Sequence, residues 1–301
     1  MLDLFCHFIH TRELASIRKG MGLPRPWTDD DIINTYRFCN VDRNDDRVTQ
    51  WIHKVIIGPH RCSRYAEYPL RRPVSNSLWF KLVIARLINQ PHTLNAMAGS
   101  LWWHDSDLHP DWEERLIAAS AKMALLGKTT FNAAYIVSTN GVKKDKLTYV
   151  IEDVLRPLEK GTPAARECCC AIWGEWLRSF NGMGAFLTNQ VITDMRYTTY
   201  LPKCVTKDWE TFVYPGPGTR RGVNRLLGRD KDASMREADV IKVVLETRDN
   251  IVKNYKTLLP QASWHIPEIF DDPNNVSNCF CEFDKYVRAT TGEGRPKQVY
   301  R

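Results

Sequence analysis

Apolar side chains recur at intervals of three and four residues along seven stretches of this sequence. The stretches are residues 29–54, 77–89, 111–126, 163–180, 185–197, 239–259 and 278–288. This spacing lines one face of a helix, whereas the strict alternation of a half-buried strand is rare in the sequence. The pattern therefore predicts a predominantly all-α fold.

The composition is that of a folded chain, since 43% of the 301 residues are hydrophobic and 10 are Trp, enough for a buried core. Breaks between helices are predicted at residues 68–73, 139–141, 214–218 and 260–273, where turn-forming residues gather. Segments with chemically suggestive residues lie on both sides of every break. We therefore expect residues 1–301 to form a single composite helical domain.

Charge and hydropathy indicate the binding partners and the cellular location of the protein. Lys and Arg number 42 against 35 Asp and Glu, a net charge of +7. This is the sign expected of a nucleic-acid-binding protein, but it also occurs in other soluble proteins. The sequence opens without a signal peptide, and no stretch approaches the roughly 18 apolar residues of a membrane span. We expect a cytoplasmic protein with no membrane partner.

The nine cysteines form neither a spaced disulfide framework nor a pair of CxxC motifs. Their pattern, which includes the run 168–170, favours reduced and mostly buried thiols over a metal site. No metal ligands are predicted. Mg²⁺ could assist a reaction of phosphate groups, but no cluster of ligands requires it.

Residues 34–51 are rich in Arg, Asn and Asp. If they continue a helix capped by Thr28, five side chains that can bind phosphate or a base lie on one side of it. They are Arg37, Asn40, Asn44, Arg47 and Trp51. An equally good interpretation is a solvated helix face, on which Arg43 or Arg47 pairs with the neighbouring aspartates.

Residues 78–89 are apolar on nearly all sides, as in a buried helix, yet they include Arg86 and Asn89. Buried polar side chains are costly unless they are paired. The favoured interpretation is that these two tie the core together. The alternative is that they line a polar pocket with Arg37 and Asn40.

Gly182 and Gly184 predict a tight turn between two helices, whose backbone N–H groups could receive a DNA phosphate. The glycines could equally serve close packing. In the following helix Gln190, Asp194 and Tyr197 share a face, so Asp194 could point into the same cavity. A lone helical Asp is more often a surface or ion-pair residue.

The stretch 214–228 contains the doubled glycines Gly216 and Gly218. We predict a glycine-rich loop there, followed by a short helix with Thr219 as its N-cap. Free N–H groups and the two arginines that follow would form an anion site, although the GxxxxGK[ST] spacing of a Walker loop is absent. The alternative is a capped surface helix with solvated arginines.

Residues 281–288 predict a helix that packs Phe283 and Val287 inward, while Glu282 and Lys285 pair or reach outward. The basic tail beyond this helix could lie along a phosphate backbone. Flexible basic tails are common, so the tail alone is a weak indication.

Five motifs occur in order along the chain. They are Arg37-x-x-Asn40-x-x-Arg43-x-x-Asp46-Arg47, Thr130-Phe131-x-x-Ala134-Tyr135, Gly184-x-Phe186 with Gln190 and Asp194, Gly216-Pro-Gly-x-x-Arg-Gly222 and Cys281-Glu-Phe-Asp-Lys-Tyr286. Together they resemble the α-glutamyl/putrescinyl thymine pyrophosphorylase family of phage enzymes, also described as amino acid:DNA transferases. The resemblance covers residues 28–298, and its last two motifs are the strongest.

The resemblance implies a helical fold related to the DNA glycosylases, with a helix-hairpin-helix element, and to the helical domain of 5-hydroxymethyluracil DNA kinases. It also implies a pathway in which a kinase first pyrophosphorylates 5-hydroxymethyluracil in double-stranded phage DNA, inside the infected bacterial cell. An enzyme of this family then replaces pyrophosphate with the amine of an amino acid or a polyamine.

The resemblance, together with the turn and the basic tail described above, gives four sets of predicted site residues. The activated nucleotide would be held by Arg37, Asn40, Arg43, Arg47, Gln190 and Lys285. Pyrophosphate, whose growing charge is stabilised by cations and N–H dipoles, would lie against Gly216, Gly218, Arg220 and Arg221. Candidates for orienting or deprotonating the amine are Asp46, Asp194 and Glu282. Candidates for binding DNA are Gly182, Gly184, Arg295 and Lys297.

Two features depart from the glycosylases. The hairpin lacks the lysine nucleophile of bifunctional glycosylases, because Ala185 and Phe186 follow Gly184, and no four-Cys spacing for an iron–sulfur centre follows. Asp208, however, lies where a glycosylase would have its catalytic Asp. Two alternatives therefore stay open, a base-excising DNA glycosylase and a non-catalytic DNA-binding protein.

Overall fold

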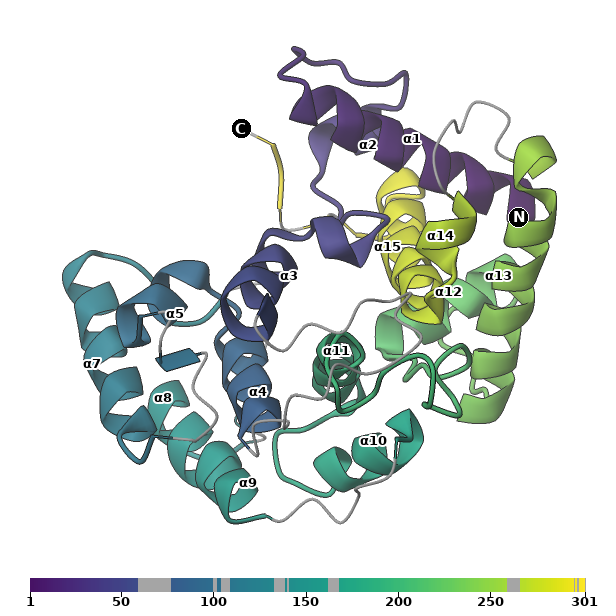
Figure 1. Ribbon diagram of the computed structural model, residues 1–301. Coiled ribbons are helices and arrows are strands. Elements are labelled where there is room, and N and C mark those ends of the chain that lie inside the picture. The colour runs from purple at the N-terminus through teal and green to yellow at the C-terminus, as the bar shows by residue number, and fades with distance from the viewer. Residues whose placement is uncertain are drawn as a thin grey trace. The chain divides into compact units, whose positions relative to one another are not determined.

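The computed structural model describes residues 1–58, 77–99, 102–103, 109–132, 139, 141–161, 168–258, 266–294, 296 and 298–300. Helices and their connections make up this part of the chain (Figure 1). None of the residues just given lies in a β-strand, apart from isolated bridges such as that of Tyr36 with Val299. The predicted all-α fold is confirmed.

The chain divides into two compact units. Unit 1 joins Met1–Asp46 to Glu210–Arg301, and unit 2 is Arg47–Trp209. Unit 1 is thus built from both ends of the sequence. The single composite domain stays a prediction, because a division into compact units does not say whether either unit folds alone.

Unit 1 has its core where α1 meets α15. Its helices are α1 (Leu2–Gly20), α2 (Asp31–Thr35), the 3₁₀ turn Arg43–Asp45, α12 (Pro217–Leu226), α13 (Glu237–Leu258), α14 (Ile266–Phe270) and α15 (Pro273–Thr290). Phe5 stacks on Phe280 with ring centroids 4.6 Å apart, and Phe8 contacts Tyr286 at 4.9 Å. All four rings are buried, so the apolar stripe of α1 is the element that closes this core.

Unit 2 is organised around α4. Its helices are α3 (Arg47–Ile52), α4 (Leu78–Ile88), α5 (Pro91–Met97), α7 (Trp112–Leu125), α8 (Lys146–Tyr149), α9 (Arg156–Lys160), α10 (Cys170–Arg178) and α11 (Ala185–Met195), with π-helical turns at His53–Ile57 and Val150–Leu155. Every residue of α4 is buried, as its apolar sequence predicts, and the helix packs against α11. Asn89 ends α4 in the left-handed conformation, with φ 48°.

The predicted helix over residues 29–54 is wrong in its middle part. Asp30, not Thr28, is the N-cap of α2, and its carboxylate accepts a hydrogen bond from Ile33 N at 3.0 Å. The helix then ends at Thr35. A predicted long helix is in fact three short helical pieces.

Pairing with the C-terminal segment explains where α2 stops. Tyr300 N donates to Thr35 O, and Arg37 N donates to Gln298 O. Further on, the Asp42 side chain accepts a hydrogen bond from the backbone two residues later, which is how Asp interrupts helices. The sequence around these residues does not reveal a partner that lies more than 250 residues away.

The other predicted helices are confirmed in their described parts, with shifted ends. Helix α15 begins at Pro273, because Asp272 caps it and Pro is favoured at the first helical position. The predicted break at residues 68–73 lies outside the described residues, as do Ala134 and Tyr135 of the second motif.

Candidate active site

Helix α15 brings together two predicted site motifs that lie 243 residues apart in the sequence. Residues 37–43 lie along this helix in unit 1. Cys39 N donates to Glu282 Oε2 at 3.1 Å, and Asn278 Nδ2 donates to Asn40 O at 3.2 Å. The first and last motifs of the sequence therefore form one continuous surface.

Glu282 and Lys285 hold the first motif against the helix. Glu282 is nearly buried, and Lys285 Nζ donates to its Oε2 at 3.2 Å. The same ammonium group also donates to the backbone oxygen of Arg37. This arrangement can position residues 37–39, and the predicted roles of Glu282 toward the amine and of Lys285 toward the substrate stay predictions.

Arg37 is an exposed cation of the first motif. Its guanidinium lies over the Tyr300 ring, 5.4 Å from the ring centroid. Asn40, Arg43 and Asp46 are half-buried, and Arg43 N donates to a side-chain oxygen of α15 at 3.0 Å. The predicted face that would join Arg37, Asn40, Asn44, Arg47 and Trp51 on one helix is wrong, because no helix runs through residues 36–42.

The glycine-rich stretch begins a helix and does not form a long loop. Gly216 is the N-cap of α12, so Gly218 and Thr219 lie in the first turn. The Thr219 hydroxyl is buried and donates to Ser277 O at 3.0 Å. The predicted N-cap at Thr219 is therefore wrong, because Pro217 already occupies a helical position.

Two glycines of α12 serve close packing. A Cβ added to Gly218 would lie 2.4 Å from Cys281 Sγ, and one added to Gly222 would lie 2.1 Å from Phe280 O. The absence of a side chain lets α12 lie directly against α15. The GPGxxRG and CEFDKY motifs thus pack against each other where α12 contacts α15. The pyrophosphate-binding role of Gly216 and Gly218 stays a prediction.

The arginines of α12 are ion-paired in this structure. Asp284 is fully buried and accepts from Arg221 Nε at 2.9 Å and Arg225 Nε at 2.8 Å, while Arg288 Nε lies 3.2 Å away. Arg220 pairs with a carboxylate of α13 at 2.8 Å. The interpretation as solvated arginines is wrong, and the contact of Arg220 and Arg221 with pyrophosphate stays a prediction.

Asp194 of α11 is fully buried in unit 2. Its two oxygens accept from Arg86 Nε and Nη2, both at 2.6 Å, and His53 Nε2 lies 3.8 Å away. Burial acts to raise the pKa of Asp194, but the neighbouring Arg86 and His53 side chains outweigh it and hold the pKa below its usual value. The interpretation that Arg86 ties the core together is confirmed, and Asp194 is its partner.

Asp208 caps another helix. Its Oδ1 accepts from Cys170 N and its Oδ2 from Ala171 N, both at 2.8 Å, so it satisfies the first N–H groups of α10. Cys169 Sγ is 3.5 Å from the same carboxylate. This is a structural role that the sequence did not indicate, because the Asp lies 38 residues beyond the helix start.

The predicted turn between two helices is present between α10 and α11. Gly182 has a φ of +77°, and a Cβ there would lie 2.6 Å from Val154 Cγ2. Gly184 is the N-cap of α11 and has open space around it. Gln190 is half-buried in that helix. DNA contact by Gly182 and Gly184 stays a prediction, and Arg295 and Lys297 lie outside the described residues.

Two buried charged residues of α1 were not among the predicted site residues. Arg12 and Glu13 are 4% and 8% exposed, and Arg12 Nη2 donates to Cys279 Sγ at 2.9 Å. Arg12 Nε, Arg12 Nη1 and Glu13 Oε2 have no hydrogen-bond partner among the described residues. The signal was available, because Arg12 follows Phe5, Phe8 and Ile9 at helical spacing on the buried stripe.

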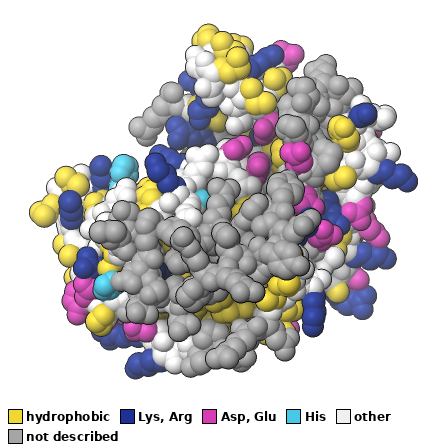
Figure 2. Space-filling view, in the orientation of Figure 1, with side chains coloured by type: hydrophobic (Ala, Val, Ile, Leu, Met, Phe, Trp, Pro, Cys, Tyr) yellow, Lys and Arg dark blue, Asp and Glu magenta, His cyan; other side chains and the backbone are white. Residues whose placement is uncertain are grey.

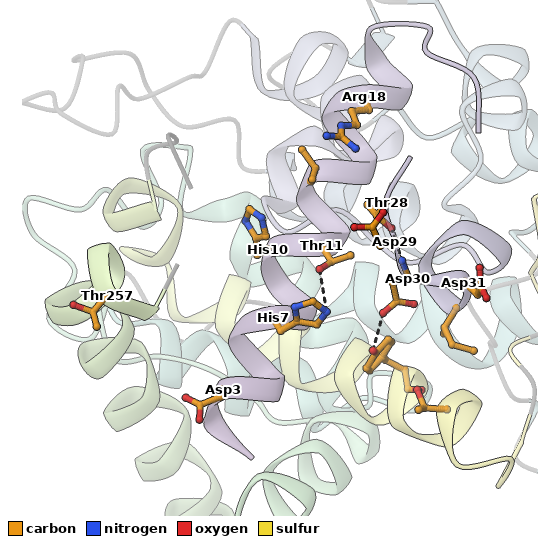
Figure 3. Close-up of a pocket in the computed structure, with 14 residues that line it drawn as sticks. Asp3, His7, His10, Thr11, Arg18, Thr28, Asp29, Asp30, Asp31 and Thr257 are labelled. Carbon is orange, nitrogen blue, oxygen red and sulfur yellow. Dashed lines mark hydrogen bonds between the residues drawn. The ribbon is translucent and has the colours of Figure 1, made fainter. Parts of the chain in front are cut away.

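A pocket of about 880 Å³ also lies against α1 in unit 1. Figure 3 shows that one wall is α1, with His7, His10, Thr11 and Arg18, and that another is the start of α2. The acidic lining residues are Asp3, Asp29, Asp30 and Asp31. Helix α15 contributes Tyr286, whose hydroxyl donates to Asp30 Oδ2 at 2.7 Å.

The pocket is lined by aspartates, most of which are exposed. Asp3, Asp29 and Asp31 are exposed, and among the described Lys and Arg side chains none lies within ion-pair distance of them. The Asp30 carboxylate already accepts hydrogen bonds from Ile33 N and from the Tyr286 hydroxyl. Burial, followed by the neighbouring Asp30, raises the pKa of Tyr286, so its proton stays on the hydroxyl. The pocket therefore offers open carboxylates to a cationic group.

Comparisons with known proteins identify a family and a similar phage protein. The family of the 5-hmdU DNA kinase helical domain matches residues 1–295, nearly the whole sequence. The chain belongs to this family. A 5-hmdU DNA kinase of Bacillus phage SP10 is 31% identical over 135 residues, which are 44% of this chain and 19% of that protein. The chain thus matches about a fifth of that relative's length, and no solved structure matches it.

Membership in the 5-hmdU DNA kinase helical-domain family confirms the relation to proteins of phage thymine hypermodification. It covers α1, which the sequence analysis left outside the resemblance. No helix among the described residues is long and apolar enough to cross a membrane. Nor do the described residues contain a group of three or more His, Cys, Asp or Glu that could hold a metal ion.

The cysteines that the structure describes are free thiols. Cys6, Cys170 and Cys279 are buried, while Cys39 and Cys204 are exposed. Burial raises the pKa of Cys6 to about 11, which keeps that thiol protonated near neutral pH. Free thiols are as predicted, although fewer are fully buried than expected.

Proposed function

We propose that this chain is an enzyme of phage thymine hypermodification. It transfers the amine of an amino acid or polyamine onto 5-pyrophosphoryloxymethyluracil in double-stranded DNA and releases pyrophosphate. The family relation supports the setting of DNA base modification. The relation concerns a helical domain, so the reaction itself has to be argued from the chain's own residues.

The observation that carries the proposal is the acidic pocket of unit 1. Its volume of about 880 Å³ lies in the range of small-molecule sites. Asp3, Asp29 and Asp31 are exposed carboxylates that a protonated amine can pair with. An amino acid or a polyamine is such a cation, whereas an anionic substrate would be repelled from this lining.

The reaction needs a proton acceptor beside the amine. The bound ammonium first loses a proton, and the free amine then attacks the methylene carbon on the base. The new C–N bond forms as the C–O bond to pyrophosphate breaks, with both electrons leaving on the pyrophosphate oxygen. The nitrogen releases its second proton last. His7, whose Nε2 lies 3.4 Å from Thr11 Oγ1 in the pocket wall, is placed to accept the first proton and pass it to solvent, and the second proton is released to solvent as well.

Cations must meet the leaving group. Arg37 and Arg43 lie on the surface that residues 37–43 form with α15, in the same unit as the pocket. Arg220, Arg221, Arg47, Gly216 and Gly218 remain further proposed contacts to pyrophosphate. Fixed cations lower the barrier because they stabilise charge that develops only as the C–O bond breaks.

Carboxylates other than those of the pocket remain proposed as catalytic groups. Asp46 is half-buried, and Glu282 is close to the first motif. Asp194 is proposed as well, although its tight pairing with Arg86 favours a structural role. Contact of the α10–α11 turn with DNA is also part of the proposal.

The test is a reconstitution with defined DNA. DNA that contains 5-pyrophosphoryloxymethyluracil is incubated with the protein and one amine at a time, such as glycine, serine, glutamate or putrescine. Mass spectrometry of the nucleosides should find a heavier thymidine derivative with one amine, and pyrophosphate should appear in equal amount.

Other products would overturn the proposal. Abasic sites would indicate a base-excising glycosylase, and unchanged DNA that is nevertheless bound would indicate a binding protein. A protein with both Asp29→Asn and Asp31→Asn is the internal control, because it should need more amine for the same rate while its DNA affinity is not weakened.

A further inference from the structure

Four exposed cations gather around two aromatic rings of unit 1. We call this the ring-anchored cluster, and its members are Arg18, Lys19, Arg25 and Arg37 around Trp27 and Tyr300. The cations come from the end of α1, the following loop and the first motif, and the C-terminal segment contributes the Tyr300 ring. Figure 2 shows several dark blue Lys and Arg side chains in the upper part of the view.

The rings fix where these cations lie. Lys19 Nζ is 4.8 Å from the Tyr300 ring centroid, and the Arg37 guanidinium is 5.4 Å from it. Trp27 packs edge-on against Tyr300 at 4.8 Å, with Arg25 over its own ring at 5.8 Å. Cation–π contacts of this kind hold long side chains that would otherwise be mobile.

Backbone hydrogen bonds add to this arrangement. Arg18 Nη1 donates to Trp27 O, and Arg25 Nη1 donates to Tyr300 O at 3.5 Å. Arg37 N donates to Gln298 O, which ties the first motif to the C-terminal segment. The cluster is therefore a built surface and not a set of independent side chains.

The charge of the cluster is not neutralised within the described residues. None of its four cations has a carboxylate at ion-pair distance there, whereas Arg156, Arg236 and Lys242 each have one. Desolvation, together with the nearby charge of Arg37, lowers the pKa of Lys19. Like charges are thus held close together, an arrangement that a polyanion would stabilise.

We propose that the ring-anchored cluster binds the phosphate backbone of the DNA substrate. Trp27 is 7% exposed, so its ring orients the cations and is not open for a base to stack on. Arg18 belongs both to the cluster and to the lining of the acidic pocket. A DNA strand on the cluster therefore runs beside the pocket that takes the amine, and this placement rests on the proposed function.

The test measures how DNA affinity depends on salt. Fluorescence anisotropy with an unmodified double-stranded oligonucleotide gives the slope of log K against log salt concentration. A triple variant, Lys19→Gln, Arg25→Gln and Arg37→Gln, should make this slope shallower by about 0.9 for each phosphate that is no longer neutralised, and so by about 2 to 3. Circular dichroism and the melting temperature establish that the variant is folded.

The matched control removes the same charge elsewhere. Arg156→Gln, Arg236→Gln and Lys242→Gln change the net charge equally, but these cations already pair with carboxylates. Their combined slope should stay within about 0.5 of the wild type, well under the change expected for a single phosphate. Equal slopes for the two triple variants would overturn the proposal.

Failure of the two proposals can be told apart. If the cluster variant has a shallower slope but no amine is transferred by the wild type, the backbone site stands and the transferase assignment falls. If the wild type transfers amine and the cluster variant binds DNA with an unchanged slope, the transferase assignment stands and the backbone site falls. A Tyr300→Leu variant keeps all four cations, and it should bind more weakly than the wild type if the ring orients them.

Discussion

Asp194 and Glu13 are both nearly inaccessible carboxylates, but their surroundings differ. Asp194 in unit 2 accepts two hydrogen bonds of 2.6 Å from one guanidinium, and its pKa is held below the usual value. Glu13 in unit 1 has an oxygen without a partner among the described residues. Burial raises its pKa, and the adjacent Arg12 offsets this only in part. A buried carboxylate whose oxygens are hydrogen-bonded stabilises the fold, whereas one with an unpartnered oxygen costs folding free energy.

The largest effect is expected from Asp194→Asn. The substitution removes the negative charge and leaves Arg86 buried without its counter-ion, which costs about 3–5 kcal/mol of unfolding free energy. Urea unfolding followed by circular dichroism measures the loss. The exposed pair of Lys144 with Asp153 provides the control, since Asp153→Asn should leave the unfolding midpoint nearly unchanged.

The pH dependence of Asp194→Asn has a definite sign. Because the folded pKa of Asp194 lies below its ordinary value of 3.8, the unfolded chain binds the proton first as pH falls. The stability that Asp194 contributes is therefore complete above that value and is lost as pH drops through the lower folded pKa. The wild type and the variant should converge in acid. A variant that is fully stable but transfers no amine in a single turnover would instead make Asp194 catalytic.

Asp208→Ala is expected to have a smaller effect. It removes the acceptor for two N–H groups of α10 and should cost about 0.5–2 kcal/mol, as for other helix caps. Asp208→Asn keeps one acceptor oxygen and should lose less. The same two variants test the glycosylase alternative, because abasic-site formation that disappears in both, at unchanged stability, would give Asp208 a catalytic role.

Glu13→Gln should act in the opposite direction from Asp194→Asn. It removes a buried charge while keeping the size and one acceptor, so at pH 7 the protein should gain stability, by less than about 1 kcal/mol. The folded pKa of Glu13 lies above its ordinary value of 4.5, so the cost of its charge is absent below pH 4.5 and grows as pH rises. The gain should vanish in acid. A stability loss at pH 7 would mean that the attraction between Glu13 and Arg12 outweighs the cost of burying the charge.

The smallest effect on stability is expected at the pocket. Asp29→Asn with Asp31→Asn should leave the melting temperature unchanged, since both side chains are exposed. The KM for the amine should rise by about 3- to 10-fold, because an exposed ion pair contributes about 1 kcal/mol at most. Putrescine, with two ammonium groups, should be affected more than glycine. Equal KM values for variant and wild type would remove the pocket from amine binding.

Local sequence patterns predicted helices such as α4, α7, α11 and α13, but they missed α1 and did not indicate which elements pack together. The all-round apolar stretch of α4 fixed its burial, and its Arg86 was expected to tie the core together. Nothing in the spacing names Asp194 as the partner, because the two lie 108 residues apart. The end of α2 at Thr35 has the same origin, since it depends on Tyr300 at the other end of the chain.

Some residue types of the predicted site serve a structural purpose as well, which the sequence does not reveal. Gly218 was predicted to bind pyrophosphate, and in the structure its missing side chain also lets α12 lie against α15. Asp208 looks like a catalytic carboxylate and caps a helix. The acidic pocket was missed because Asp29 and Asp31 also suit the first turn of any helix. Only the tertiary contacts distinguish these uses.

The discontinuous composition of unit 1 has a consequence for how the protein is made. Cys279, the partner of Arg12, is synthesised 267 residues after it, which takes roughly 15 to 50 s at ribosomal rates of about 5–20 residues per second. During this interval the apolar stripe of α1 emerges without the helix that covers it. All of unit 2 is translated in the meantime. We therefore expect a chaperone that captures exposed apolar helices to bind α1 until translation reaches α15.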